Sequence, residues 1–395
     1  TPQDSYLNGM SVIRIAEQEE VDAIHPGIGF LSESPHYARI CREHGFNFIG
    51  PRVANMDRMG NKSNAIATAK NLKIPVVPGS DGALMDPAQA MVAASEIGFP
   101  VLIKAAHGGG GKGIEVVHEV TNFQSIFSRM FQEALSAFGN GDLYLEKYIG
   151  SMRHLEVQII RDMHGNSKLL GIRDCSVQRN YQKLIEETAS GIPKKVREQV
   201  YNYAEKLIDK IDYIGAGTVE FIYDLTEKKI YFMEMNTRIQ VEHPVTEMIT
   251  GIDLVKEQIR IAYTKKLTLT QDDVSINGHA MEFRVNAEDY KNNFMPCPGT
   301  VELFLPPGGK GVRTDSFIYP GFKIPPQYDS LVGKLIVWGK DRAETIQRAN
   351  RALEEFVIDG VTTVIPFHQK VLKHKKFIQG DFDTHFVECY IDELI

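Results

Sequence analysis

The chain has 395 residues, too many for one compact core, so its length predicts two or three domains. A net charge of −7 argues against a nucleic-acid partner, and the apolar runs are shorter than the roughly 20 residues of a membrane-spanning helix. The N-terminus does not resemble a signal peptide, and no CxxC pair occurs among the four cysteines Cys41, Cys175, Cys297 and Cys389. We therefore expect reduced thiols and a cytoplasmic protein, with neither nucleic acid nor membrane as a partner.

Short apolar runs and helical patterns alternate in the first third of the chain. This alternation predicts a parallel sheet, with strands at 21–24 and 47–50 and helices at 35–44 and 62–71. Turn-forming residues at 78–82 mark a hinge. A helix at 87–97 follows, and then a β-β-α-β unit that we interpret as a small lid domain, with strands at 99–105, 114–120 and 143–149 and a helix at 122–137.

From residue 154 onward the pattern changes to antiparallel hairpins with a few helices. Apolar residues recur at every second position from Leu155, the chain turns at 164–166, and a return strand follows at 168–174. Helices are expected at 194–210, 252–262 and 342–356. These elements predict the α+β class with an α/β start, divided into domains at 1–76, 77–149 and 150–395.

Residues 234–242 carry a row of polar side chains. In a strand, alternate residues share one face, which here would hold Glu234, Asn236, Arg238, Gln240 and Glu242. His243 and Pro244 would then break the strand. Two carboxylates with an amide suit a cation that prefers oxygen ligands, such as Mg²⁺, and an arginine suits a small planar oxyanion. The alternative is a charged face exposed to solvent.

A glycine-rich loop joins two strands of the lid. It holds two lysines and five glycines, namely Lys104, Gly108, Gly109, Gly110, Gly111, Lys112 and Gly113, and such a loop can wrap a polyphosphate. The P-loop pattern GxxxxGK[ST] fails at Ala106 and Gly113, and a dinucleotide-binding loop would open a helix rather than a strand. The sequence predicts a flap over nucleotide phosphates, and the alternative is a hairpin tip.

Glu220 lies on a strand that returns through a turn at 224–229 to Glu234. The hairpin can place these two carboxylates side by side, where they would repel each other unless divalent cations bridged them. Alone, Glu220 would be an ordinary surface residue. Together with Glu234 and Asn236, it predicts a metal site.

The glycine loop, the acidic pair and residues 236–247 resemble the ATP-grasp superfamily, and within it they closely resemble biotin carboxylase. Further matches span the chain, at 25–33, 59–62, 78–80, 145–148, 153–156, 173–176, 182–183 and 325–330. The resemblance implies an ATP-grasp fold with a partial N-terminal α/β domain, a small lid and a C-terminal antiparallel β-rich domain. It also implies ATP- and bicarbonate-dependent carboxylation of biotin on a carrier protein, through carboxyphosphate.

The same resemblance implies roles for individual residues. Around ATP, these are Lys62, Lys104, the Gly108–Gly113 flap with Lys112, Glu146, Lys147, His154, Gln178 and Tyr181. Mg²⁺ or Mn²⁺ would be bound by Glu220, Glu234 and Asn236. Bicarbonate would contact Lys183, Arg238, Gln240 and the backbone of Val241. Glu242 would act as general base, and Arg313 would bind biotin and stabilise its enolate.

Three features depart from the family's pattern. The chain begins inside the family's usual N-terminus, without residues used in dimer contacts, so we expect a weakened homodimer. Tyr181 stands where the family usually has a histidine near the ribose, and a phenol can still hydrogen-bond a hydroxyl. Ile28 replaces a usual tyrosine near biotin.

Two other functions fit part of the pattern. Another ATP-grasp ligase, joining a carboxylate to an amine, would share the flap and the acids but not residues 238–244. A truncated non-catalytic homologue would bind nucleotide or partner subunits without turnover. The chain also lacks the Ala-Met-Lys-Met segment that carries covalent biotin. We therefore expect a separate subunit, with a biotin carboxyl carrier protein and a carboxyltransferase as partners, as in multi-subunit acetyl-CoA carboxylase.

Overall fold

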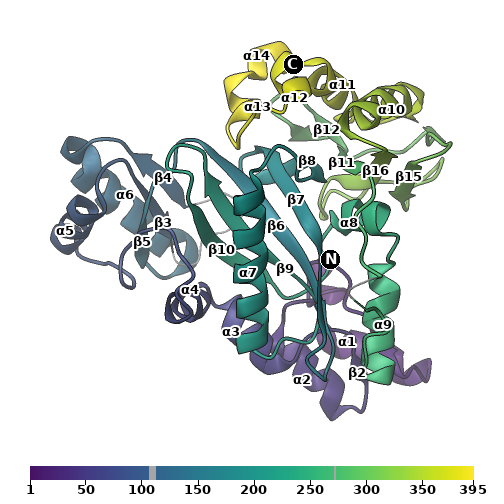
Figure 1. Cartoon of the computed structure of the whole chain (residues 1–395), viewed down its shortest axis with the longest axis horizontal. Helices are drawn as coiled ribbons and strands as arrows, with labels where there is room; N and C mark the ends of the chain where they lie inside the picture. Colours follow the sequence, from purple (N-terminus) through teal and green to yellow (C-terminus); the bar gives the residue numbers. More distant parts are fainter. Residues whose placement is uncertain (106–112, 271–272) are drawn as a thin grey trace.

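An eight-stranded antiparallel sheet forms the centre of the protein in the computed structural model, which describes residues 1–105, 113–270 and 273–395 (Figure 1). The strand order is β10-β9-β6-β7-β8-β11-β16-β15. Their bounds are β6 Met152–Arg161, β7 Ser167–Arg179, β8 Gln182–Thr188, β9 Gly215–Asp224, β10 Ile230–Asn236, β11 His279–Asn286, β15 Val312–Ser316 and β16 Leu331–Gly339. The hairpins predicted after residue 154 are confirmed, including the turn at 164–166 between β6 and β7.

Helices cover both faces of this sheet. Ile159 of β6 packs in one apolar cluster with α7 (Lys194–Lys210), whereas the next residue, Ile160, packs in another with α9 (Leu254–Thr264). Because successive strand residues point to opposite faces, α7 and α9 lie on opposite sides of the sheet (Figure 1). The predicted helix at 194–210 is confirmed to the residue, and the one predicted at 252–262 lies two residues further on.

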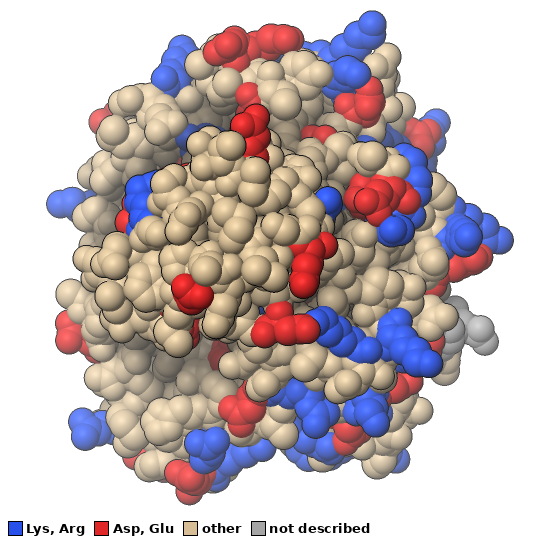
Figure 2. Space-filling view, turned by 90° about the vertical axis from the view of Figure 1, so that its left-hand side faces the viewer, with Lys and Arg blue, Asp and Glu red and all other residues tan. Residues whose placement is uncertain are grey.

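The lid is a separate three-stranded antiparallel sheet in the order β4-β3-β5, with its own apolar core. Its elements are α5 Pro87–Ile97, β3 Val101–Ala105, β4 Ile114–Val117, α6 Val120–Phe138 and β5 Leu143–Lys147. The β-β-α-β order is therefore confirmed. Asp86 caps α5, because its carboxylate accepts hydrogen bonds from the backbone of Ala88 and Gln89. The face that carries the lid is mostly uncharged at its centre (Figure 2).

The N-terminal part contains the predicted parallel pairing, but its two strands are only two residues long. Its elements are η1 Pro2–Asp4, α1 Gly9–Gln18, β1 Ala23–Ile24, α2 Pro35–Glu43, β2 Asn47–Phe48, α3 Val53–Gly60 and α4 Lys62–Asn71. The α+β class is confirmed. The domain boundaries at 76 and 149 stay a prediction.

The C-terminal part packs helices and short strands on the β11–β16 end of the sheet, around a large apolar cluster (Figure 1). Its elements are β12 Glu288–Asp289, β13 Met295–Pro296, β14 Leu303–Leu305, α10 Arg342–Glu355, β17 Val357–Asp359, α11 Ile365–Lys373, α12 Lys375–Gln379, α13 Phe386–Cys389 and α14 Ile391–Leu394. Within the described ranges, no helix combines the length and apolar character needed to cross a membrane.

The strand predicted through residues 234–242 is wrong beyond Asn236, where β10 ends. The carboxylate of Glu33 accepts hydrogen bonds from the backbone of Thr237 (2.9 Å) and from Nε of Arg238 (3.0 Å), and these bonds hold the chain in a bend. His243 and Pro244 begin helix α8 (His243–Thr250) rather than break a strand. Proline is tolerated in the first helical turn, because backbone N–H groups there have no partner within the helix and proline carries no N–H.

Candidate active site

A largely buried lysine on β8, Lys183, joins three carboxylates, and its side chain is 12% exposed. Nζ of Lys183 lies 2.7 Å from Oε2 of Glu156, 2.6 Å from Oε1 of Glu242 and 3.4 Å from Oε1 of Glu220. Burial alone would lower the pKa of Lys183, but the three carboxylates outweigh it and hold that pKa well above its usual value. The ammonium is therefore a fixed positive charge at the middle of the cluster.

Glu242 lies between this ammonium and a guanidinium. Its Oε2 is 3.1 Å from Nη2 of Arg284 on β11. Burial would raise the pKa of Glu242, but Lys183, Arg284 and Arg173 hold it well below the usual value of a glutamate. Glu242 is thus a carboxylate in this structure, with one cation at each oxygen.

Arg284 is a site residue that the sequence reasoning missed. Its Nε also bonds Oε1 of Glu186 at 2.6 Å, and its side chain is 19% exposed, whereas that of Glu242 is only 2% exposed. Among the described residues, its Nη1 makes no hydrogen bond. One sequence signal was available, because Glu282 and Arg284 alternate with apolar residues along β11.

Arg173 on β7 supports the cluster from within the protein. The side chain is completely buried and its guanidinium makes five hydrogen bonds, to Glu156, Gln158, Thr246, Thr218 and Gln240. Such a fork-shaped group fixes several partners at once. Through these bonds, Arg173 fixes the position of Gln240 and one oxygen of Glu156.

The residues predicted for bicarbonate come together although they do not share a strand. Nη2 of Arg238 donates to Oδ1 of Asn236 at 2.7 Å, and Nε2 of Gln240 donates to Oε1 of Glu220 at 2.6 Å. The backbone oxygen of Val241 accepts a bond from Nζ of Lys334 at 2.7 Å. One network thus joins Lys183, Arg238 and Gln240 through Glu220 and Asn236. Their bicarbonate-binding role stays a prediction.

Glu220 and Glu234 lie directly opposite each other on β9 and β10, as the hairpin pattern predicted. Glu220 accepts bonds from Asn236 (2.7 Å) and pairs with Nε2 of His154 (2.6 Å), whereas Glu234 makes no hydrogen bond with the described residues. Burial, and then the nearby Glu220, raise the pKa of Glu234. A divalent cation would relieve this repulsion, and two carboxylates with an amide oxygen are ligands that Mg²⁺ prefers. The donor set therefore fits Mg²⁺ or Mn²⁺.

Three of the residues predicted for ATP, namely Lys104, Glu146 and Lys147, lie on the lid strands β3 and β5, and Lys62 begins α4. Lys104 forms an ion pair with Glu146, and Nζ of Lys62 lies 3.8 Å from the same carboxylate. Nζ of Lys147 donates to the carbonyl of Gly98 at 3.3 Å. Gly108, Gly109, Gly110, Gly111 and Lys112 lie outside the described residues, but the strands that flank them, β3 and β4, pair antiparallel as predicted. The contacts with ATP stay a prediction.

Gln178 and Tyr181 belong to the hairpin between β7 and β8. Asn180 and Tyr181 form its two-residue turn, with φ of 49° and 63°. Positive φ at both central positions matches the twist of the flanking strands. Tyr181 is therefore presented at the hairpin tip, with 55% of its surface exposed, while Gln178 is buried.

Arg313 does not contact Glu242. Its guanidinium bonds Asp315 through Nε (2.7 Å) and Nη2 (2.8 Å), and Glu247 through Nη1 (2.6 Å). All three nitrogens are thus committed to carboxylates, and the guanidinium beside Glu242 belongs to Arg284. Ile28, the other residue assigned to the biotin side, is half-buried against the apolar cluster around α9.

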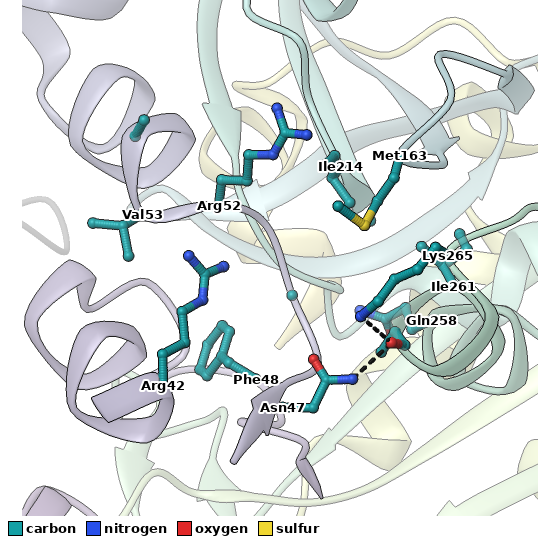
Figure 3. Close-up of a pocket in the computed structure, with 14 residues that line it drawn as sticks. Arg42, Asn47, Phe48, Arg52, Val53, Met163, Ile214, Gln258, Ile261 and Lys265 are labelled. Atoms are coloured by element: carbon teal, nitrogen blue, oxygen red, sulfur yellow. Dashed lines mark hydrogen bonds between the residues drawn. The ribbon is translucent and has the colours of Figure 1, made fainter. Parts of the chain in front are cut away.

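A cavity of about 440 Å³ lies apart from these residues, between β2, the start of α3 and the end of α9 (Figure 3). Arg42, Arg52 and Lys265 line it, but Arg52 is paired with Asp212, and Lys265 donates to the carbonyl of Ala262. No residue predicted for the active site lines this cavity. The chemistry therefore points to the Lys183 cluster rather than to this space.

Three family models match successive parts of the chain. The N-terminal domain of biotin carboxylase matches residues 1–56, the ATP-binding domain of the carbamoyl-phosphate synthase L chain matches 61–270, and the C-terminal domain of biotin carboxylase matches 282–389. Biotin carboxylase 1 of Bacillus subtilis is 51% identical over 389 residues, which cover 98% of this chain and 86% of that protein. The chain belongs to the biotin carboxylase family.

Other biotin carboxylase relatives act in different carboxylases. A pyruvate carboxylase subunit of Methanothermobacter thermautotrophicus is 46% identical, with 98% of this chain and 79% of that protein covered. The biotin carboxylase domain dimer of 2-oxoglutarate carboxylase from Hydrogenobacter thermophilus, solved with MgADP, ADP and bicarbonate, superposes with a TM-score of 0.94. It is 45% identical and covers 100% of this chain and 87% of that one. The ATP-grasp biotin carboxylase fold implied by the sequence is confirmed.

Proposed function

We propose that this chain carboxylates biotin with ATP and bicarbonate, the first half-reaction of a biotin-dependent carboxylase. The observation that carries the proposal is the arrangement of Lys183, Glu242 and Arg284 beside the Glu220–Glu234 pair. It combines a base, fixed cations for an oxyanion and oxygen ligands for a metal. Membership of the biotin carboxylase family supports the same reaction.

The first step activates bicarbonate. An oxygen of bicarbonate attacks the γ-phosphorus of ATP, the bond to the bridging oxygen breaks, and carboxyphosphate and ADP form. Lys183 and Arg238 hold the bicarbonate, Gln240 orients it, and Lys62 and Lys104 turn from Glu146 to the nucleotide phosphates. Mg²⁺ at Glu220, Glu234 and Asn236, when bound, offsets the repulsion between the two anions.

Glu242 takes the proton in the next step. Its pKa is low in this structure because Lys183 and Arg284 both face it. A bound anion competes for these cations, and the pKa of Glu242 then rises toward that of a useful base. Glu242 removes the proton of carboxyphosphate, which splits into CO₂ and phosphate. The phosphate deprotonates N1′ of biotin, and the nitrogen attacks CO₂.

Charge that develops on the ureido oxygen of biotin needs a preorganised cation. Arg284 suits this role better than the predicted Arg313, because its Nη1 is not bonded to any described residue and it already lies beside the base. Arg313 is bonded at every nitrogen. We therefore transfer the proposed biotin-enolate role to Arg284.

The partners follow from the reaction. The substrate is biotin on a carrier protein, and carboxybiotin must then reach a carboxyltransferase, so both are proposed as partners. The acceptor is acetyl-CoA, propionyl-CoA or pyruvate, a choice made outside this chain. A homodimer is proposed from the dimeric Hydrogenobacter relative, and a cytoplasmic location from the four free cysteines.

The test is ADP release from MgATP, measured with and without bicarbonate and free biotin. Hydrolysis that requires bicarbonate and rises with biotin is expected. ATP binding without hydrolysis would instead support the non-catalytic homologue. Hydrolysis that depends on an added amine and carboxylate substrate would support another ATP-grasp ligase.

A further inference from the structure

Two glutamates on neighbouring strands lie next to Arg284 but outside the residues assigned to the reaction. Glu186 of β8 and Glu282 of β11 are directly opposite each other in the antiparallel register, so their side chains share one face. Both are completely buried. Arg284 follows two residues after Glu282 and points to the same face.

Three of the four carboxyl oxygens in this pair have no hydrogen-bond donor among the described residues. They are Oε2 of Glu186 and both oxygens of Glu282. The fourth, Oε1 of Glu186, accepts the bond from Nε of Arg284 at 2.6 Å. A buried carboxylate without donors is strongly disfavoured, and two facing carboxylates would also repel each other. A proton on one of them removes both costs.

The proton belongs on Glu282. The charged groups that face it are Lys334 on β16, Glu186 on β8, Arg284 on its own strand and Glu242 at the start of α8. Burial raises the pKa of Glu282 well above its usual value, and the attraction of Lys334 does not compensate. Lys334 donates to the backbone oxygen of Val241 instead. Burial also raises the pKa of Glu186, to about 7, but Arg284 bonds this carboxylate directly and offsets part of the cost, so the charge of the pair lies on Glu186.

We propose that Glu186 is a positioning residue for Arg284, and that a protonated Glu282 fixes Glu186 by donating its O–H to Oε2. The inference rests on the proposed function, since it concerns the arginine assigned to the biotin enolate. Glu186, Arg284 and Glu242 form one chain of contacts into the site, and Glu282 faces Glu186 across the strand pair. When Glu242 takes up its proton, it stops attracting Arg284, and Glu186 then holds the guanidinium where the ureido charge develops.

The chain offers a matched control on the same strand. Glu187 is also buried and also bonds an arginine, with Oε2 2.8 Å from Nε of Arg342, but as the next residue of β8 it points to the other face. Glu186→Gln and Glu187→Gln therefore each replace a buried carboxyl group that bonds an arginine, although Glu187 also pairs with His279. Only the first removes a charge beside the reaction.

The experiment compares the two variants with the wild type in bicarbonate-dependent ATP hydrolysis, with and without free biotin. Glu186→Gln is expected to lower kcat/KM for biotin at least about tenfold, while hydrolysis without biotin stays within about threefold. Glu187→Gln should change both readouts by the same factor. Equal losses of both activities in Glu186→Gln, or no loss, would overturn the positioning role.

Glu282 is tested by Glu282→Gln and by the infrared spectrum. The amide of glutamine donates to Glu186 as the acid does, so kcat/KM for biotin should stay within about threefold, and the carbonyl stretch of a protonated carboxyl group should disappear. The same stretch should persist in Glu187→Gln. If the wild type shows no such stretch at neutral pH, the shared proton is refuted. This result is independent of catalysis, so a chain without bicarbonate-dependent hydrolysis would refute the proposed function alone.

Discussion

Lys183 and Glu242 form a partly buried ion pair, with Nζ 2.6 Å from Oε1, although 59 residues separate them in the chain. The lysine comes from a sheet strand and the glutamate from the residue just before a helix. Each lowers the cost of burying the other's charge. The pair therefore keeps both groups ionised and ready for an anionic substrate.

Replacing Glu242 with glutamine should abolish the reaction while nucleotide binding remains. Loss of a general base typically costs about 10²–10⁴-fold in rate, so bicarbonate-dependent ADP release should fall by at least about 100-fold. The affinity for MgATP, measured by titration calorimetry, should change less than about threefold. Glu257→Gln is the control, since Glu257 is a buried glutamate on α9 paired with Arg260. Unchanged turnover in Glu242→Gln would remove the general-base assignment.

Arg284 and Arg313 are the two candidates for stabilising the biotin enolate, and replacing each with methionine distinguishes between them. Arg284→Met should lower biotin-dependent turnover about 100-fold or more, because a preorganised cation is lost where charge develops. Arg313→Met removes bonds to Glu247 and Asp315 and should lower it much less. Turnover with free biotin, compared with hydrolysis without biotin, is the measurement. The opposite order of effects would return the biotin-enolate role to Arg313.

The sequence predicted the fold well where hydrophobic period and turn residues, which are local signals, determine an element. The helix at 62–71, the lid order and the facing of Glu220 and Glu234 could all be read from period and turns. The course of residues 237–242 could not, because a bond from the distant Glu33 bends the chain there. The alternation of strand residues predicted that Arg238, Gln240 and Glu242 share one face of a strand. They lie in one site because the chain bends after Asn236, and not because a strand continues there.

Sequence analysis did not identify Arg284, also because its partners are distant in the chain. Its partners, Glu186 and Glu242, lie 98 and 42 residues away, and only the sheet order brings β8 next to β11. Arg313, in contrast, lies on β15, and only the resemblance to the family gave it the biotin role. Contacts between distant residues depend on sheet topology, which a single sequence specifies weakly.

Glu234→Gln tests the metal site with two readouts. The concentration of Mg²⁺ needed for half-maximal hydrolysis should rise at least about tenfold, because one anionic ligand is lost. Without metal, the melting temperature should rise, since the variant no longer carries a charge facing Glu220. Glu227→Gln, on the exposed turn between β9 and β10, should change neither. An unaltered Mg²⁺ requirement in Glu234→Gln would contradict the ligand assignment.

Buried histidines should make the protein less stable in acid. Burial lowers the pKa of His368 to about 4, and burial with the nearby Lys334 lowers that of His243 to about 3. An unfolded histidine titrates near 6.5, so below that pH the unfolded state binds more protons, and stability falls as the pH drops toward these values.

The acid effect is measured as the free energy of unfolding in urea between pH 7 and pH 4.5. In His368→Gln the amide can still donate to the carbonyl of Arg284, as the ring nitrogen does at 2.7 Å. The slope against pH should then decrease by up to about one proton. His164→Gln, at the exposed β6–β7 turn, should leave the slope unchanged. An equal slope in His368→Gln and wild type would show that His368 takes up its proton in the folded protein as readily as in the unfolded chain.

Arg173→Met should destabilise the whole protein. The side chain is completely buried and bonds five residues, so its loss removes the donor to Oε1 of Gln240 and to Oε1 of Glu156. Water cannot easily replace these donors at a buried site. Breaking a buried ion pair on one side typically costs about 3–5 kcal/mol in the free energy of unfolding. Arg351→Met is the control, because Arg351 forms an exposed pair with Glu355 one helical turn away, worth less than about 1 kcal/mol.

The two variants differ in a second way that urea unfolding alone does not show. Arg173 holds Oε1 of Gln240, whose amide nitrogen holds Glu220, so a chain of bonds runs from the protein interior to the metal-binding carboxylate. Arg173→Met should therefore also raise the Mg²⁺ concentration needed for half-maximal hydrolysis, under conditions where the variant is fully folded. Equal stability losses in the two variants would show that the buried guanidinium contributes no more than a surface one, and that the network around Glu220 is held by other contacts.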